Sequence, residues 1–535
     1  MKIYMKTRIL FLITLLYTAF TSMQTGYAAT ITVMNTNDSG AGSLRQALAD
    51  ANDGDTINFD ASVTGTIELI PDIANDPPAG ELLVNKSISI SGPGANILAV
   101  SGGNHVRVFD IAPGKTVAIS GLTIEYGSYT PPFSYNIGGG ILNNNATLTV
   151  SNCTFSNNQV GTGGAICNYH TATLTVNACT FSGNAASFGG AICTFPELAS
   201  SSSTMTVENS TFSSNGSVFG GAIYNGYPNQ NFGGGSTVTL TVENSTFSGN
   251  NGITSGASIS NETISGSAAI STVRNSTFSG FIDPNSGAGG AIFNGGGNTA
   301  TLTIGSTILK AGSQGANIVN SGGTITSVGY NLSSNDASAF LNATGDQNST
   351  DPNLGPLQDN GGPTFTQALL PGSPAIDKGK NFSGSTTDQR DTGFARTVDN
   401  PSIANATGGD GTDIGAFEVQ AAYAAQIQQP INADGSSVFN VKRGVIPVKF
   451  TLTLNGVATC TLPPATIALT RTAGGATGSI DESVYSGPAD TGSNFRIESC
   501  QYVYNLSASA LGVGAYRVDM IINSQVVGSG IFALK

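Results

Sequence analysis

A motif that recurs through the middle of the chain constrains the fold more than any other feature. Five copies of Leu-Thr-Val-x-Asn-(Ser/Cys)-Thr-Phe, or a close variant, end at Phe155, Phe181, Phe212, Phe247 and Phe278. A Gly-Gly-Ala-Ile motif alternates with them and ends at Ile166, Ile192, Ile223 and Ile292. Copies lie about 26 to 35 residues apart, and the variation falls between the motifs rather than inside them. Strands of fixed length joined by loops of variable length are typical of a solenoid.

One such repeat cannot bury its own apolar side chains, so successive coils must stack. Strands stacked about 4.8 Å apart place equivalent residues directly above one another. We therefore predict an all-β chain built around a right-handed parallel β-helix over residues 81–345, with the valines, phenylalanines and isoleucines of the motifs as inward ladders. Hydrophobic residues make up 39% of the chain and charged residues only 10%, and no helical periodicity is sustained. Both observations favour β structure.

Asparagines recur two or three residues after the apolar anchors. One column comprises Asn158, Asn184, Asn215 and Asn250, and a second comprises Asn143, Asn168, Asn225, Asn261 and Asn294. Stacked amides can bond to one another along a column and satisfy corner groups that would otherwise stay unpaired. We predict this structural role, with sugar binding as the alternative.

The N-terminus has the features of a secretory signal. A basic start with Lys2, Lys6 and Arg8 precedes an apolar run over 9–20, and small residues surround Ala28. We expect a signal peptide over 1–28, cleaved after Ala28, and hence export to the cell surface or the medium. The alternative is a membrane anchor, but the apolar run is short for a span. No later segment has the length and composition of a spanning helix.

The remaining sequence divides into three parts. Residues 29–80 are expected to form an N-terminal cap and the first coils, and 346–420 a C-terminal cap of the helix. Residues 424–535 lose the repeat and alternate like the strands of an immunoglobulin-like sandwich. Cys460 and Cys500 are the only cysteines of this tail, and we predict a disulfide between them.

The other four cysteines form two pairs, each one coil apart. Cys153 and Cys179 occupy a slot that other coils fill with serine, which indicates small inward side chains. Cys167 and Cys193 share a column with Tyr224 and Phe293, and this variety indicates an outward position. Adjacent coils bring either pair within disulfide range, but parallel in-register geometry is awkward for a bridge, so both states remain open.

Several motifs resemble known bacterial surface proteins. Phe155-Ser-Asn-Asn158 and its copies, with Gly-Gly-Ala-Ile, resemble the repeats of chlamydial polymorphic outer membrane proteins. The opening segment 31–47 looks like the N-terminal cap of β-helix surface proteins. Gly372-Ser-Pro-Ala-Ile-Asp377 with Asp413-Ile-Gly-Ala-Phe-Glu418 resembles a choice-of-anchor Q ending, and Pro447-Val-Lys-Phe450 resembles a PxKF domain. The resemblance implies a protein of the cell envelope or outer membrane, or a secreted one, often an adhesin.

Charge and chemistry argue against several functions. A formal net charge of −13 disfavours nucleic acid as a partner. The acids of the repeat region are sparse, and His105 and His170 have no evident nucleophile partner, so we assign no catalytic residue and no cofactor. The exception is an acidic cluster running from Asp377 to Glu418, which either binds Ca²⁺ at the end of the helix or forms a polar capping segment.

These observations favour an adhesin-like monomer that binds glycan or protein. Its long flat face, with outward aromatics such as Tyr224 and Phe293, suits contact with a partner. The alternative is a polysaccharide lyase or glycoside hydrolase of the pectate-lyase-like β-helix type, because that shape also serves such enzymes. A passive structural spacer is a third reading.

Overall fold

The computed structural model describes residues 28–71, 80–128, 136–197, 200–227, 235–264, 266–281, 290–297, 299–312, 315–400, 402–420, 423–442, 444–454, 457–474, 488–522 and 525–535. The predicted signal peptide lies outside them, apart from Ala28. The chain divides into two compact units, Met1–Val419 and Gln420–Lys535.

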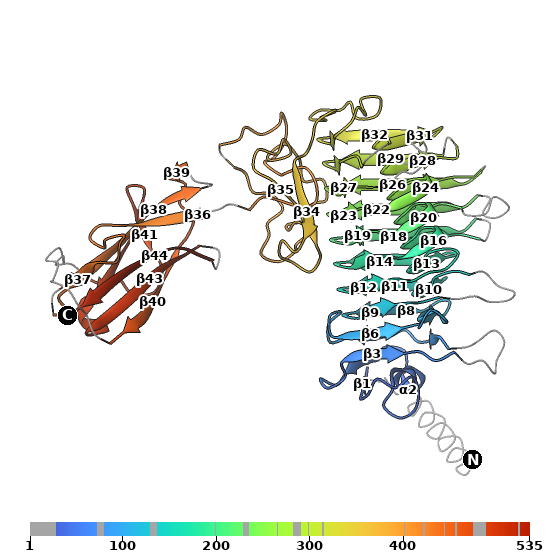
Figure 1. Ribbon diagram of the computed structural model, residues 1–535, viewed down its shortest axis with the longest axis horizontal. Coiled ribbons are helices and arrows are strands. Elements are labelled where there is room, and N and C mark those ends of the chain that lie inside the picture. The colour runs from blue at the N-terminus through green and yellow to red at the C-terminus, as the bar shows by residue number, and fades with distance from the viewer. Residues whose placement is uncertain are drawn as a thin grey trace, which may run out of the picture. The chain divides into compact units, whose positions relative to one another are not determined.

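Three long parallel sheets form the body of the first unit (Figure 1), and we name each after its inward ladder. The eleven-stranded valine sheet contains β1 (Thr30–Val33), β2 (Thr56–Phe59), β5 (Ser89–Ser91), β8 (Thr116–Ser120), β11 (Thr147–Ser151), β14 (Thr173–Asn177), β18 (Ser202–Glu208), β22 (Thr237–Glu243), β26 (Ala268–Arg274), β29 (Ala300–Gly305) and β32 (Thr324–Gly329). The ten-stranded phenylalanine sheet contains β3 (Gly65–Glu68), β6 (Leu98–Ser101), β9 (Thr123–Glu125), β12 (Thr154–Ser156), β15 (Thr180–Ser182), β19 (Thr211–Ser213), β23 (Thr246–Ser248), β27 (Thr277–Ser279), β30 (Ile308–Leu309) and β33 (Leu332–Ser333).

The nine-stranded isoleucine sheet closes the tube. It contains β4 (Leu82–Val84), β7 (Phe109–Ile111), β10 (Ile141–Asn144), β13 (Ile166–Tyr169), β17 (Ile192–Phe195), β21 (Ile223–Asn225), β25 (Ile259–Glu262), β28 (Ile292–Gly295) and β31 (Ile318–Ser321). A fourth, short sheet of β16 (Ala185–Phe188), β20 (Gly216–Phe219) and β24 (Asn251–Ser255) fills the loops between the phenylalanine and isoleucine sheets. The predicted fold class, a right-handed parallel β-helix, is confirmed.

Register explains why the repeats stack without slipping. Phe155 pairs with Phe181, Phe181 with Phe212, and the same register continues through Phe247 and Phe278. The five rings lie 4.6 to 4.7 Å apart between centroids, with interplanar angles of 1° to 7°. All five are buried in one core with the valine and isoleucine columns. The equal spacing of the rings shows that the same register is kept from one coil to the next.

Buried asparagines bond from coil to coil. The side-chain nitrogen of Asn184 donates to Asn215 Oδ1 at 2.9 Å and to the Phe155 carbonyl at 3.0 Å. Asn158 and Asn215 repeat this pattern, and Asn250 donates to the Phe212 carbonyl. In the second column, Asn143 donates to Asn168, Asn225 to Asn261, and Asn261 to Asn294. Every side chain of both columns is buried, which makes them internal supports of the corners rather than ligand contacts.

The ends of the tube are covered by short local elements. At the N-terminal end, α2 (Leu44–Asp50) begins at Ser43, whose hydroxyl accepts from the Gln46 amide at 3.2 Å. The helix buries Leu44, Ala47 and Leu48. At the other end, Ala337 and Leu341 join the main core after the last coil.

Residues 351–419, which we call the flank segment, run along the side of the coils. The segment carries the antiparallel pair β34 (Leu354–Gln358) and β35 (Thr366–Leu369), which Figure 1 shows beside the stacked sheets. Its hydrogen bonds to the solenoid reach from Asn209 to Tyr330. We expected residues 346–420 to cap the helix end. The structure shows instead that most of this range covers the outer side of the phenylalanine sheet.

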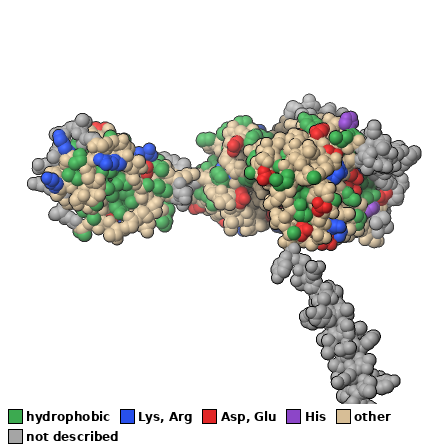
Figure 2. All heavy atoms as spheres, turned by 90° about the horizontal axis from the view of Figure 1, so that it is seen from below, with side chains coloured by type: hydrophobic (Ala, Val, Ile, Leu, Met, Phe, Trp, Pro, Cys, Tyr) green, Lys and Arg blue, Asp and Glu red, His purple; other side chains and the backbone are tan. Residues whose placement is uncertain are grey.

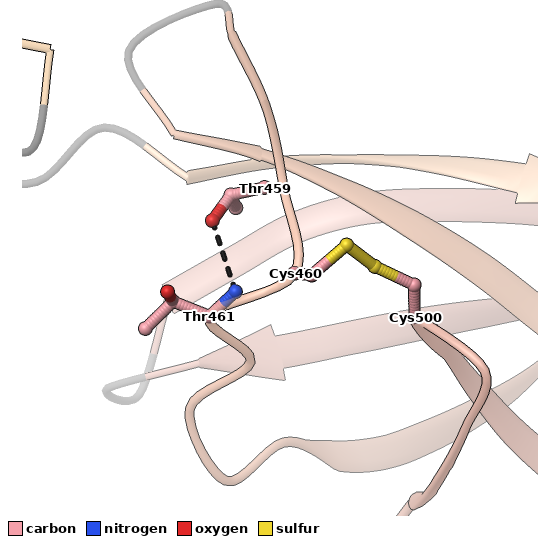
Figure 3. The surroundings of a disulfide bond; sticks show 4 residues. All are labelled: Thr459, Cys460, Thr461 and Cys500. Carbon is pink, nitrogen blue, oxygen red and sulfur yellow. Dashed lines mark hydrogen bonds between the residues drawn. A yellow bond between two sulfur atoms is a disulfide. The ribbon is translucent and has the colours of Figure 1, made fainter.

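The tail is a β-sandwich. One sheet contains β36 (Tyr423–Gln428), β38 (Val445–Leu454), β39 (Val457–Thr459), β41 (Arg496–Glu498) and β42 (Gln501–Ser507), and the other contains β37 (Ser437–Phe439), β40 (Thr466–Ala473), β43 (Gly514–Ile522) and β44 (Gln525–Leu534). Both sheets contribute to one core that includes Phe450, Tyr502 and Met520, and the short helix α3 (Ala508–Leu511) follows β42. The predicted disulfide joins Cys460 to Cys500 (Figure 3).

The aromatic column predicts a specific sensitivity. Replacing Phe212 with alanine removes a buried ring that has a stacked neighbour on each side, and we expect a loss of about 3–5 kcal/mol in the free energy of unfolding. Circular dichroism during urea titration measures it. Ser213→Ala on the same strand is the control and should change stability by less than about 0.5 kcal/mol. A Phe212→Ala loss below about 1 kcal/mol would contradict the core role of the column.

Candidate functional site

A small charged cluster lies near the start of the isoleucine sheet. The Arg107 guanidinium bonds to Glu81 at 2.8 Å, lies 4.0 Å from Asp110, and also donates to the carbonyls of Ile137 and Gly138. Burial raises the pKa of Asp110 to about 6. Two carboxylates and one arginine thus occur together, but the arginine is committed to holding the 137–138 turn. This arrangement is first of all a structural ion pair.

The second cluster surrounds one of the two histidines. The Tyr169 hydroxyl bonds to Glu197, and the rings of Tyr169 and His170 lie 3.7 Å apart. Burial lowers the pKa of His170, and its Nδ1 is buried without a hydrogen-bond partner. No serine or cysteine nucleophile is hydrogen-bonded to this ring, since Ser203 instead bonds to the His170 carbonyl. The histidine therefore lacks the partner that nucleophilic catalysis needs.

The acidic cluster of the flank segment uses its carboxylates to hold backbone. Asp388 accepts from the Arg390 and Glu418 amides at 2.8 and 2.9 Å. Asp413 accepts from the Asp377 and Val419 amides at 2.8 and 2.7 Å. Within the described ranges, no three acidic, histidine or cysteine side chains come together in a way that could hold a metal ion. These bonds give the acidic cluster a structural role in the flank segment.

Two arginines complete this buried network. The Arg390 guanidinium bonds to Asp388 at 2.6 Å and stacks on the rings of Phe394 and Phe417, 4.0 and 3.7 Å from their centroids. Arg396 is fully buried, lies 3.6 Å from Glu418 and donates to the Asp413 carbonyl. Burial raises the pKa of Asp413 to about 7 and that of Glu418 well above its usual value.

Buried polar side chains attach the flank segment to the coils. Gln389 donates to Thr211 Oγ1 at 2.8 Å and accepts from Thr246 Oγ1 at 2.5 Å. The Ala416 amide donates to Thr277 Oγ1 at 3.0 Å. These three threonines are equivalent positions of successive coils, so a regular column of the solenoid holds an irregular segment.

The outward column of the isoleucine sheet does not form the exposed aromatic surface that we expected. Tyr224 is only 2% exposed and packs with Cys167 and Cys193 in a separate apolar cluster under the loops. Phe293 is half-buried. Cys167 and Cys193 face away from the main core as predicted, but they too are buried, and all four β-helix cysteines are free thiols. The Cys153 amide lies 3.4 Å from Cys179 Sγ, which places this pair one above the other.

The outer side of the eleven-stranded valine sheet is a regular surface, which we call the threonine face. Leu and Val of each motif point inward, so the flanking threonines point outward in two columns. Residues of the first column are Thr116, Thr147, Thr173, Thr204, Thr239, Ile270, Thr301 and Thr324. Residues of the second are Thr149, Thr175, Thr206, Thr241, Thr272, Thr303 and Thr326. All are exposed or half-buried.

Charged side chains lie beside this face, and one edge of it carries a column of them. The next column outward contains Glu208, Glu243 and Arg274, with Arg274 3.4 Å from Glu243. With Ser383 to Ser385 of the flank segment, the two glutamates line a hollow of about 270 Å³. Figure 2, a view of another side of the same unit, also shows acidic and basic side chains scattered singly. The sequence already contained the signal for the threonine face, the alternation Thr-x-Thr, but we used it only as evidence for strands.

Comparisons with known proteins add a fold neighbour. No protein-family model and no curated protein matches the sequence. Among solved structures, the chain is similar to one described as the crystal structure of pectate lyase Pel9A, with 12% identity and a TM-score of 0.38 over 74% of this chain and 98% of that chain. At this level of similarity we draw no conclusion about activity from it. In the described residues, no helix is long and apolar enough to cross a membrane.

The flank segment gives a testable pH dependence. Burial raises the pKa of Asp377 from 3.8 to about 6, so its contribution to stability is complete below pH 3.8 and is lost as the pH rises through 6. One carboxylate oxygen accepts from the Asn400 amide, while the other is buried without a partner. Asp377→Asn keeps the first bond and suits the positive φ of 57°. We expect a gain of about 1–2 kcal/mol at pH 8 and none at pH 4.

Urea titration at both pH values, with limited proteolysis of residues 351–419, measures this gain. The exposed Asp391, also at positive φ, supplies the control variant Asp391→Asn, which should change stability equally little at both pH values. An equal gain at pH 4 and pH 8 for Asp377→Asn would show that charge is not the cause.

Proposed function

We propose that the protein is exported to the cell surface or the medium and acts as an adhesin-like binding protein without catalysis. The signal-like sequence before Ala28 supports export, and the resemblance of the repeats to bacterial surface proteins supports adhesion. The threonine face is the proposed binding surface. Its ligand is an extended, uncharged surface of a glycan or a protein.

The observation that carries this proposal is the uniformity of the threonine face. From β11 to β29 the register between neighbouring strands is continuous, so equivalent hydroxyls repeat at every coil. Neither column contains an ionisable side chain. A surface of this kind makes many equal, weak contacts. Their binding free energies sum to a stable complex only when the ligand is long enough to make many of them at once.

A polysaccharide lyase or hydrolase is the second candidate, and one observation favours it. Glu81, Arg107 and Asp110 combine two carboxylates with a basic group, and the pKa of Asp110 is raised. Perturbed carboxyl groups of this kind are frequent at active sites. Against it stand the bonds of Arg107 to backbone carbonyls, which fix the side chain in place.

Substitution of the threonine face tests the binding proposal. Thr175→Lys with Thr206→Lys places two charges in the middle of the second column, and we expect at least a tenfold loss of binding to whichever glycan or protein surface the full chain binds on an array. Ser187→Lys with Val218→Lys introduces the same charges in the same two coils on the short fourth sheet, and should leave binding unchanged.

Incubation of the unmodified chain with uronates and neutral polysaccharides completes the test. Product release that is abolished by Asp110→Asn would overturn the non-catalytic proposal in favour of the enzyme. Equal binding by both lysine variants would remove the threonine face as the binding surface.

A further inference from the structure

The threonine face has a two-dimensional repeat. In one direction, equivalent threonines lie on neighbouring strands, about 4.8 Å apart. In the other, Thr-x-Thr places two threonines on the same side of one strand, about 6.6 Å apart. Six strands, β11, β14, β18, β22, β29 and β32, carry the full Thr-x-Thr pair, and β26 carries Ile270 and Thr272. The face is therefore a grid rather than a single row.

The grid is also regular along the solenoid. The stacked rings of Phe155 to Phe278, which belong to the same coils, keep centroid spacings of 4.6 to 4.7 Å from one coil to the next. The strands of the threonine face pair in register over the same coils. Equal spacing and constant register keep the threonines of one column at one repeat along the solenoid.

Threonine makes this grid uniform in chemistry and in shape. A β-branched side chain on a strand has few rotamers, so neighbouring hydroxyls and methyls repeat in the same orientation. Thr175, Thr206 and Thr241, in the middle of the second column, are half-buried by their neighbours above and below and reach solvent with their outer atoms. Their positions are fixed before any ligand arrives, which lowers the entropic cost of binding.

The composition of the grid narrows the ligand. The two columns contain no cation for a phosphate or sulfate, no carboxylate for a basic partner and no aromatic ring on which a sugar could stack. Charge complementarity therefore points to a neutral ligand. A grid with a hydroxyl group at every listed position except Ile270 fits a ligand that is itself a regular lattice of hydrogen-bonding groups.

We propose that the threonine face binds ice. A crystal plane of frozen water is neutral, flat and rigid, and consists of oxygen atoms that both donate and accept hydrogen bonds at short, regular repeats in two directions. The threonine hydroxyls occupy positions of that lattice, and the methyl groups between them order the intervening water. This inference rests on the proposed function, because it names the ligand of the same binding face.

Many threonines of the face must contact the crystal plane at the same time for such binding to be stable. One threonine contributes little, and the affinity comes from the whole grid meeting the crystal plane at once. A bulky side chain in the middle of the grid holds the neighbouring threonines away from the plane, so it should act far beyond its own position. The same side chain on another sheet should have no effect.

Slow freezing of a dilute solution of the full chain tests the proposal. We expect the protein to enter the ice fraction and to stop the coarsening of ice grains in a frozen sucrose film. Thr206→Tyr should reduce both effects at least tenfold, and Ser187→Tyr, at an exposed position of β16 in the short fourth sheet, should leave both unchanged. Unaltered circular dichroism and thermal melting confirm that each variant is folded.

The outcomes separate this inference from the proposed function. If the unmodified chain is excluded from ice, the ice proposal is wrong. If that chain still binds a glycan or protein surface through Thr175 and Thr206, the adhesion proposal stands. Incorporation into ice by Thr206→Tyr at the level of the unmodified chain also overturns it. If substitutions in the threonine face alter neither ice nor array binding, both proposals fail.

Discussion

In-register stacking of parallel coils is the constraint on which the rest of the structure depends. Once Phe181 lies on Phe155 and Phe212 lies on Phe181, every other residue of the motif is fixed above its own equivalent. The core ladders, the buried amide columns and the outer threonine columns are then three consequences of one register. A slip by one residue would exchange the inward and outward sets of a strand, and the buried asparagines oppose such a slip, because a displaced amide would lose its neighbour and its carbonyl together.

The flank segment is held together by a different kind of interaction from that of the coils. It has few regular strands, so buried side chains rather than a ladder satisfy its backbone amides. Asp388, Asp413 and Glu418 each accept from two backbone groups, and two arginines balance part of their charge. Burial raises the pKa values of Asp413 and Glu418, as it does for carboxyl groups at many active sites, although here the two groups hold loops together. A shifted pKa in this unit is therefore no guide to catalysis unless the partners of the group are known.

The sequence predicted the parts of the structure that are built from the repeated motifs, but not the irregular parts. The identical spacing of Val, Phe, Ile and Asn in each copy made the ladders readable, because parallel stacking converts a period in sequence directly into a column in space. The burial of Tyr224 could not be predicted in this way, since Phe188 and Phe219, which pack in its cluster, belong to a short fourth sheet outside the repeated motifs. The path of the flank segment could not be predicted either, because Gln389 contacts Thr246, 143 residues away, and no local pattern encodes such a pairing. For the binding face, the outward threonines could be recognised in the sequence, but their arrangement as a grid depends on the register between strands, which the structure shows.

The attachment of the flank segment limits how the protein can change its length. Its hydrogen bonds to the solenoid run from Asn209 to Tyr330, and a coil removed or duplicated within that series would displace every later contact by one position. The number of coils in this part of the solenoid can therefore change only together with the length of the flank segment.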